Sequence, residues 1–327
     1  MTLGEDYQQP VRGRLYTIIP ESAERAAVSR PFIDTHVHLM ETSLYSWFNP
    51  DKAPTFEGAW DPLFEAGDYL ADDLVDELTG SNFSVVGAVH VQANADDPVA
   101  EVAFEQRMSE ETGLPIMIVA GGDLSSPSIE ATLEEESSYA NTRGFRQNLN
   151  IHPHPLYRYV DKSYMDDPDW LRGLGLLRKY GLSFDMQLYP TQFARAVEVI
   201  DAHPETLFII NHAGMLADRD LEGWRLWKNG LYELGRRDNV AIKISGLPSM
   251  DHYWTIESLR PAVYTVLDAF GVGKVMFASN FPVDKLHSSL VDLVHAYARV
   301  TEELSPAEQD ALFVDNARKF YRFQPIG

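Results

Sequence analysis

Histidines at two places in the chain could together bind a metal ion. His36 and His38 stand in the segment PFIDTHVH (31–38), and His212 ends the segment TLFIINH (206–212). Alternate residues of a β-strand point to the same side, so the first two imidazoles would face one direction. Neutral imidazole is a good ligand for zinc and related ions. All three could share one ion if the fold brings the two segments together.

Short apolar segments, separated by longer amphipathic stretches, indicate the elements that would position these histidines. β-branched and aromatic residues dominate several of the short segments, which is typical of strands. Eight segments fit the pattern: 31–38, 83–91, 115–121, 142–149, 182–188, 206–212, 240–246 and 274–280. Strands that alternate with helices in this way predict an α/β fold, and eight units favour a (β/α)8 TIM barrel. The alternative is an open doubly wound sheet with a second domain, but no glycine-rich phosphate-binding motif follows an early strand.

Local signals predict where several helices begin and end. A capping side chain followed by proline marks four helix starts, at Asp97-Pro98, Ser126-Pro127, Asp167-Pro168 and Ser305-Pro306. Tyr180-Gly181 predicts a helix end. The spacing of apolar residues over 61–79 predicts a helix there.

The barrel fold would bring the three histidines to one place. The carboxyl ends of the strands in a TIM barrel meet at one mouth, where catalytic residues gather. His36, His38 and His212 all stand at or near such strand ends. Three protein ligands with one open position is the usual layout of a catalytic zinc site. We therefore predict one divalent metal ion, most simply Zn²⁺, bound by these three side chains.

Composition narrows the classes of partner. The 327 residues carry a formal net charge of −22, which disfavours nucleic acid and anionic membrane surfaces as partners. The absence of cysteine excludes disulfides and thiolate metal sites. No apolar run is long enough for a transmembrane helix, and residues 1–30 lack the pattern of a secretory signal. We expect a polar arm over 1–30, a single barrel domain over 31–327, a cytoplasmic location and a small-molecule substrate, with a homodimer possible.

Several motifs resemble those of the amidohydrolase superfamily. They are FIDTHVHL, INHAGM, KISGL and FASNFPVDKL, together with GFRQNLN and the closing DNARKFYRF. The resemblance extends from about residue 31 to the end of the chain. It is closest to the branch that contains sugar-lactone, sulfomuconolactone and pyrone-dicarboxylate lactonases. It implies a TIM barrel hydrolase with His36, His38 and His212 as metal ligands.

Two positions depart from the pattern of that superfamily. A histidine often follows its fifth strand, but this chain has Gln187 there, which implies one metal ion or none. The aspartate that follows its eighth strand is replaced by Asn280, and an amide cannot accept a proton as a general base. Asp284 could supply the missing carboxylate if the loop folds back; the alternative is a solvated loop acid.

Two cationic side chains could hold substrate oxygens and stabilise developing negative charge. Alternation along 240–246 directs the Lys243 side chain toward the barrel axis. A buried ammonium group there requires a negatively charged partner, either an anionic substrate or a core acid such as Asp185 or Asp34. Arg146 and Gln147 point to opposite sides of their strand, so only one can face the pocket. Arginine suits a carboxylate, although an ion pair beneath the site is an equal alternative.

Further candidates could contact the substrate through hydrogen bonds or apolar surface. His90 and Gln92 share a face near the end of 83–91, where a histidine satisfied within the core is the alternative for His90. The connection 41–60 is long and rich in aromatic residues, which suits a loop folded over a binding site. Trp47 is the candidate from this connection for contact with the substrate. The alternative is that it covers an apolar edge of the barrel.

These observations favour hydrolysis of a lactone or related cyclic ester by an activated water. The expected substrate is an anionic or polyhydroxy lactone. Two alternatives remain open at this point. Related barrels decarboxylate aromatic acids, although their first-strand motif is Glu-x-His. A ligand-binding barrel without catalytic activity would explain the lost strand-8 carboxylate, but it would not require three histidines at one mouth.

Overall fold

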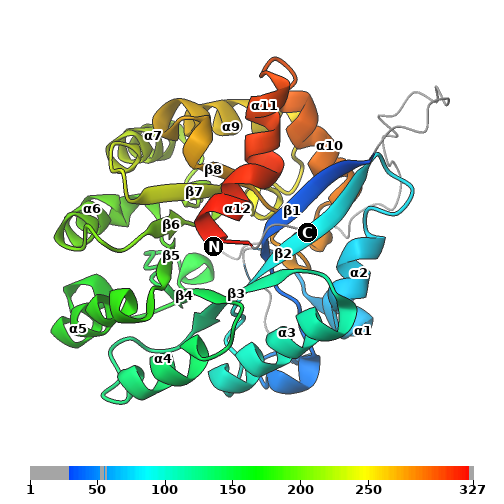
Figure 1. Cartoon of the computed structure of the whole chain (residues 1–327). Helices are drawn as coiled ribbons and strands as arrows, with labels where there is room; N and C mark the ends of the chain where they lie inside the picture. Colours follow the sequence, from blue (N-terminus) through cyan, green and yellow to red (C-terminus); the bar gives the residue numbers. More distant parts are fainter. Residues whose placement is uncertain (1–28, 52–54, 56, 324–327) are drawn as a thin grey trace, which may run out of the picture.

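The strands of the computed structural model form one parallel sheet that curves into a barrel, with helices around it (Figure 1). The structure describes residues 29–51, 55 and 57–323. The eight strands follow in chain order: β1 Arg30–Val37, β2 Phe83–Val91, β3 Ile116–Gly121, β4 Thr142–Asn148, β5 Ser183–Gln187, β6 Phe208–Ile210, β7 Val240–Ile244 and β8 Val275–Phe277. Each strand pairs in parallel with the next. The predicted TIM barrel is confirmed, and the open-sheet alternative is wrong.

The barrel closes where β1 meets the segment after β8. Val37 forms a parallel bridge with Phe281, and the His38 N–H donates to the Phe281 carbonyl over 2.7 Å. The Asn280 N–H donates to the His36 carbonyl, also over 2.7 Å. Backbone hydrogen bonds therefore hold the metal-ligand candidates of the first strand beside the residues that follow the eighth.

Helices of very different lengths surround the strands. They are α1 Asp61–Ala66, α2 Ala71–Asp76, α3 Pro98–Thr112, α4 Ile129–Ser137, α5 Pro168–Leu176, α6 Phe193–Ala202, α7 Leu221–Gly235, α8 Leu247–Met250, α9 Ile256–Phe270, α10 Leu290–Val300, α11 Pro306–Asp310 and α12 Asn316–Tyr321. The core combines strand residues with the inner faces of these helices, including the fully buried Trp170 and Trp227. No helix of the described residues is long and apolar enough to cross a membrane.

Most of the predicted helix boundaries agree with the structure. Asp97, Asp167 and Ser305 cap α3, α5 and α11, each accepting hydrogen bonds from first-turn N–H groups. Gly181 ends the 3-10 turn after α5 with φ 66°. α4 begins at Ile129, later than Ser126-Pro127 predicted.

The single helix predicted over 61–79 is wrong, because the segment contains two short helices. Gly67 follows α1 with φ 76°, a left-handed conformation that ends the first helix. Of the predicted arm, residues 1–28 lie outside the described part of the chain, and β1 already begins at Arg30.

Candidate active site

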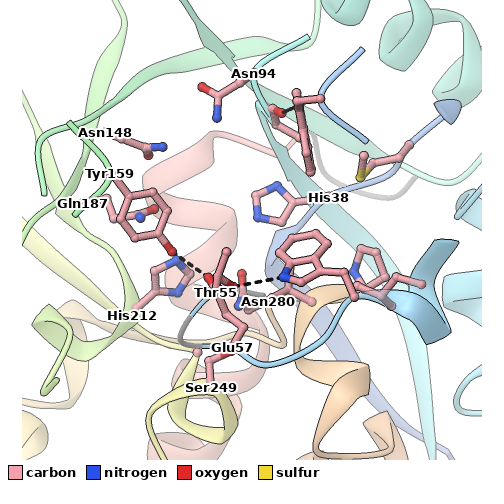
Figure 2. A pocket seen from close by; sticks show the side chains of 18 of the residues that line it. His38, Thr55, Glu57, Asn94, Asn148, Tyr159, Gln187, His212, Ser249 and Asn280 are labelled. Atoms are coloured by element: carbon pink, nitrogen blue, oxygen red, sulfur yellow. Dashed lines mark hydrogen bonds between the residues drawn. The ribbon is translucent and has the colours of Figure 1, made fainter. Parts of the chain in front are cut away.

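A cavity of about 380 Å³ opens at the carboxyl ends of the strands. Its polar lining comes from loops and strand ends far apart in the sequence. Figure 2 labels His38, Thr55, Glu57, Asn94, Asn148, Tyr159, Gln187, His212, Ser249 and Asn280, and Arg146 also belongs to the lining. Trp47, Phe48 and Trp60 add aromatic surface. The position agrees with the rule that TIM barrels place their binding sites at this face.

The structure brings the three candidate metal ligands together. The ring centroid of His36 lies 4.3 Å from that of His212 and 5.1 Å from that of His38. His38 and His212 line the cavity, whereas His36 is completely buried among them. The turn after β6 holds His212 at φ 54°, in the left-handed region of backbone conformation.

The hydrogen bonds of the three rings leave nitrogen atoms available. His38 Nδ1 lies 2.7 Å from the Val91 carbonyl oxygen, so this nitrogen carries the proton and Nε2 keeps its lone pair. His212 Nδ1 lies 3.0 Å from the Ser245 hydroxyl. Both ring nitrogens of His36 are buried without a hydrogen-bond partner among the described residues. Buried polar atoms without partners are costly, so a group that binds here would relieve that cost.

Burial also sets the charge of these rings. Desolvation lowers the pKa of His36 well below its ordinary value, and the neighbouring His212 and Lys243 lower it further. Desolvation and the nearby Arg146 likewise lower the pKa values of His38 and His212. All three imidazoles are therefore neutral at neutral pH, which is the form that binds metal.

The donor set fits a metal ion in its chemistry, but the coordination geometry is not formed. Within the described residues, no group of three or more His, Asp or Glu side chains is already arranged to hold an ion. The three rings lie close together without forming such a group. The role of His36, His38 and His212 as ligands stays a prediction.

Asn280 and Asp284 form a pair at the cavity wall, but only Asn280 lines the cavity. The Asn280 amide donates to Asp284 Oδ1 over 3.0 Å, and the Ser249 hydroxyl donates to the same oxygen over 2.5 Å. Asp284 is fully buried, and desolvation raises its pKa to about 7 against the opposing effect of these two bonds. Asp284 is therefore not the solvated loop acid of the alternative, and its predicted role as the base is not supported by a place on the cavity lining. Its side chain orients Asn280 and Ser249 instead.

Of the two candidates on β4, Arg146 faces the cavity. One guanidinium nitrogen donates to Gln187 Oε1 over 2.8 Å, and another donates to the Gln92 carbonyl oxygen. Burial lowers the pKa of Arg146 to about 10, so the side chain remains cationic at neutral pH. Gln147 points outward, where its side chain accepts from Trp170 Nε1. The expected alternation along β4 is therefore present, and it places one cation beside the cavity.

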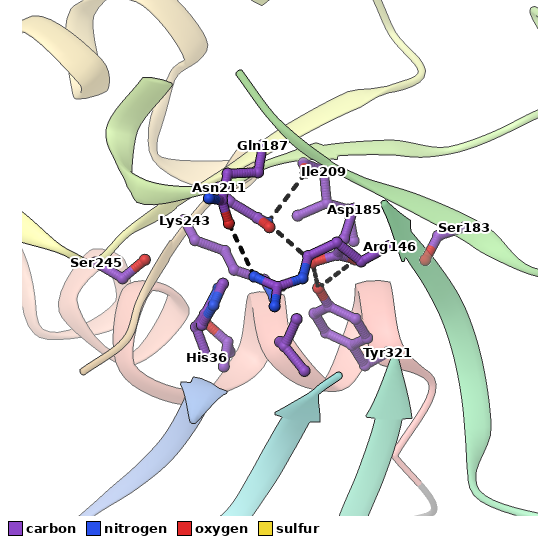
Figure 3. Close-up of polar contacts among 12 residues, drawn as sticks. His36, Arg146, Ser183, Asp185, Gln187, Ile209, Asn211, Lys243, Ser245 and Tyr321 are labelled. Atoms are coloured by element: carbon purple, nitrogen blue, oxygen red, sulfur yellow. Dashed lines mark hydrogen bonds and ion pairs between the residues drawn. The ribbon is translucent and has the colours of Figure 1, made fainter. Parts of the chain in front are cut away.

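Lys243 lies inside the barrel below the cavity rather than at its mouth (Figure 3). Its ammonium group forms a 2.7 Å ion pair with Asp185, and both side chains are fully buried. Asp185 also accepts hydrogen bonds from Tyr321 and Asn211. Desolvation lowers the pKa of Lys243, while Asp185 opposes that change. The predicted contact with substrate does not fit, and the alternative of a core ion pair with Asp185 is the arrangement present.

His90 and Gln92 do not line the cavity, contrary to their predicted role. The His90 ring lies 3.3 Å from carboxylate oxygens of Glu101 and Glu105 on α3. The Gln92 side chain accepts the Asn94 N–H over 2.6 Å. Both faces of a buried parallel strand are covered, so alternation alone does not tell which face is inside the barrel.

The long connection after β1 does cover the cavity. Trp47 lines it, and its indole N–H donates to the Ala93 carbonyl over 2.8 Å. The same connection contributes Glu57, which is 6 % exposed and accepts a 2.6 Å hydrogen bond from the Tyr159 hydroxyl. Sequence reasoning missed Glu57 and Tyr159. The only signal was that the loop is long and rich in aromatic residues, which does not tell where one carboxylate will point.

This chain belongs to the amidohydrolase family, whose model matches residues 33–323. The barrel, with histidines at the ends of its first and sixth strands, is consistent with that assignment.

The chain can also be compared with individual proteins that are similar to it in sequence or in structure. The chain is 37 % identical over 297 residues to the uncharacterized protein y4mH of Sinorhizobium fredii, which covers 89 % of this chain and 98 % of the relative. It is 27 % identical over 269 residues to an L-fucono-1,5-lactonase of Burkholderia multivorans, covering 78 % and 86 % of the two chains. A crystal structure of a B. multivorans amidohydrolase with bound zinc superposes with a TM-score of 0.74 at 25 % identity, covering 90 % and 99 %.

Proposed function

We propose that this protein hydrolyses a lactone or a related cyclic ester, with the help of one divalent metal ion held by His36, His38 and His212. The observation that carries the proposal is the group of three neutral imidazoles at the cavity. Within residues 29–51, 55 and 57–323, two of their rings have one nitrogen engaged in a hydrogen bond, and the third has none. Similarity to L-fucono-1,5-lactonases supports the substrate class, and the zinc in the related crystal structure supports the choice of ion.

When bound, a divalent ion would polarise the ester carbonyl and make a water molecule more acidic. The residues of this chain would orient the substrate. Arg146 places a cationic guanidinium beside the cavity, where it stabilises negative charge that develops on the carbonyl oxygen. The Gln187 and Asn280 amides lie on the same lining and can hydrogen-bond to substrate oxygens.

The reaction adds one water across the ester. A bond forms between the water oxygen and the carbonyl carbon, and the ring C–O bond breaks. The former ring oxygen takes up a proton, and the product is a hydroxy acid. Among the described residues that line the cavity, Ser249 and Asn280 are the ones that hydrogen-bond to the buried Asp284, so we assign it a positioning role.

The proposal can be tested with a panel of five- and six-membered lactones. Acid release is followed in a weakly buffered indicator solution for the wild type and for His212→Ala. His154→Ala is the matched control, because His154 is an exposed histidine in the loop after β4 and is not part of the cavity lining. We expect the wild type and the control to open at least one lactone and His212→Ala to lose that activity. Equal activity in all three proteins would contradict the proposal.

A further inference from the structure

Glu57 places a negative charge inside the cavity, and its surroundings do not neutralise it. The carboxylate lines the cavity, and within the described chain no Lys, Arg or His forms an ion pair with it. Its two hydrogen-bond donors are the neutral hydroxyls of Tyr159 and Thr55, one on each oxygen. Burial and the nearby Glu57 raise the pKa of Tyr159 well above its ordinary value, so Tyr159 stays a neutral donor.

The carboxylate retains capacity to accept more hydrogen bonds. An ionised carboxylate offers about four acceptor positions on its two oxygens, and the two hydroxyls use only part of them. Figure 2 shows the Tyr159 hydroxyl directed toward Glu57 and Thr55, with His38 and His212 among the other residues of the lining. A ligand that occupies this cavity would therefore meet an acceptor that is already held in place.

The backbone of the same segment is also fixed. His287 Nε2 lies 2.5 Å from the Glu57 carbonyl oxygen, and Thr55 exchanges backbone hydrogen bonds with Gly58. The Thr55 hydroxyl, which donates to Glu57, accepts in turn from the indole N–H of Trp60. These contacts orient the Glu57 side chain before any ligand binds, and such preorganisation makes a polar group effective in selecting a ligand.

Among the described residues, Arg146 is the one cation that lines the cavity, and it does not compensate for Glu57. Arg146 already donates to Gln187 and to the Gln92 carbonyl, and its Nε is buried without a partner in the part of the chain that the structure describes. The remaining polar lining consists of neutral hydroxyls, imidazoles and amides, and the amides include Asn94 and Asn148. Amides and a carboxylate suit a ligand that carries hydroxyl donors, and they suit a second carboxylate poorly.

We propose that Glu57 is a specificity-determining residue that selects neutral, hydroxyl-bearing lactones and rejects lactones that carry a carboxylate. This inference rests on the proposed lactone hydrolysis and narrows its substrate class. Glu57 accepts hydrogen bonds from substrate hydroxyl groups, and its charge repels an anionic substituent at the same position. A substrate that leaves a buried polar group without its hydrogen-bond partner is strongly disfavoured, so one residue is sufficient for selectivity between lactones.

The test compares two lactones that differ at one carbon. D-glucono-1,4-lactone carries a hydroxymethyl group where D-glucaro-1,4-lactone carries a carboxylate. We expect the wild type to show a kcat/KM at least about tenfold higher for the neutral lactone, and Glu57→Gln to reduce that ratio by about tenfold. Glu41→Gln removes the same charge from the same connection, outside the cavity lining, and should leave the ratio unchanged.

Two results would overturn the inference while lactone hydrolysis stands: an unchanged ratio in Glu57→Gln, or an equal loss of activity on both substrates. The latter would place Glu57 at the ester itself. Binding of the corresponding neutral and carboxylate-bearing lactams, measured by calorimetry, gives the same comparison without turnover. If no lactone is opened, the proposed function fails, and equal binding of the two lactams by the wild type would overturn the selectivity separately.

Discussion

The cavity and the barrel interior beneath it both contain buried polar and charged groups, but they satisfy them differently. Beneath the cavity, the Lys243 ammonium and the Asp185 carboxylate pair with each other, and Tyr321 and Asn211 supply further hydrogen bonds. At the cavity, the rings of His38 and His212 each have one nitrogen engaged by the protein. The opposite charges of the lower cluster are paired with each other, whereas the upper cluster retains binding capacity.

This difference implies that the lower cluster contributes mainly to stability and the upper cluster mainly to function. Ions buried in a closed cluster must be compensated by the protein itself, because neither water nor ligand reaches them. Groups that line a cavity can leave a lone pair unused, since a bound ligand can interact with that lone pair. The two clusters adjoin, and Lys243 helps to keep the His36 and His212 rings neutral by lowering their pKa values. A substitution in the lower cluster should therefore act mainly on folding, and one in the upper cluster mainly on turnover.

The largest effect on stability is expected for Lys243→Met. It leaves Asp185 buried without its cation, and loss of one partner of a buried pair typically costs about 3–5 kcal/mol. Urea unfolding followed by circular dichroism measures the change. Lys179→Met is the matched control, because Lys179 and Glu130 form an ion pair of the same 2.7 Å length with both side chains more than half exposed. Similar losses in the two variants would remove the distinction between buried and exposed pairs.

A smaller effect, on activity, is expected for Ser245→Ala. The Ser245 hydroxyl lies 3.0 Å from His212 Nδ1 and orients the ring. Loss of such a supporting partner typically lowers metal affinity or activity about 10–100-fold. Lactone turnover and zinc affinity should both fall in this range while the urea midpoint stays nearly constant. Ser288→Ala, in the loop after β8, is the control. A Ser245→Ala protein with wild-type zinc affinity would show that His212 does not need this contact.

The smallest effect is a pH dependence that comes from Asp284. Its pKa is raised to about 7 in the folded protein, above the ordinary value of 3.8. Between these values the folded chain holds a proton that the unfolded chain has released, so the free energy of unfolding falls as pH rises toward 7. The slope from one such group is at most about 1.4 kcal/mol per pH unit. Asp284→Asn should flatten the measured slope between pH 4 and 7 relative to wild type, and parallel profiles would contradict this assignment.

The sequence was sufficient for the fold because the signals that define it are local. Strand segments, proline caps and the glycine after Tyr180 each depend on neighbouring residues, and they gave the order of the eight strands. The proximity of His36 and His212 was predicted only from the rule that the carboxyl ends of the strands of a TIM barrel meet at one mouth. Gly67 was the exception, since apolar spacing across 61–79 concealed its helix-breaking conformation.

The parts of the site that could not be predicted depend on tertiary contacts. Which face of β2 is inside the barrel decided the role of His90, and helix α3 supplied its partners Glu101 and Glu105. Lys243 could pair with a core acid or meet a substrate, and only the position of Asp185 decided between them. Glu57 was missed because the path of a long loop depends on what it packs against.

Metal content measured on active enzyme shows whether the three imidazoles hold one catalytic ion. Wild type, His38→Ala and the His154→Ala control are dialysed against trace zinc, and zinc per chain and lactone turnover are measured on the same samples. We expect about one ion per chain with turnover in wild type and control, and loss of both in His38→Ala. Wild-type turnover in a His38→Ala protein that holds no zinc would contradict the account.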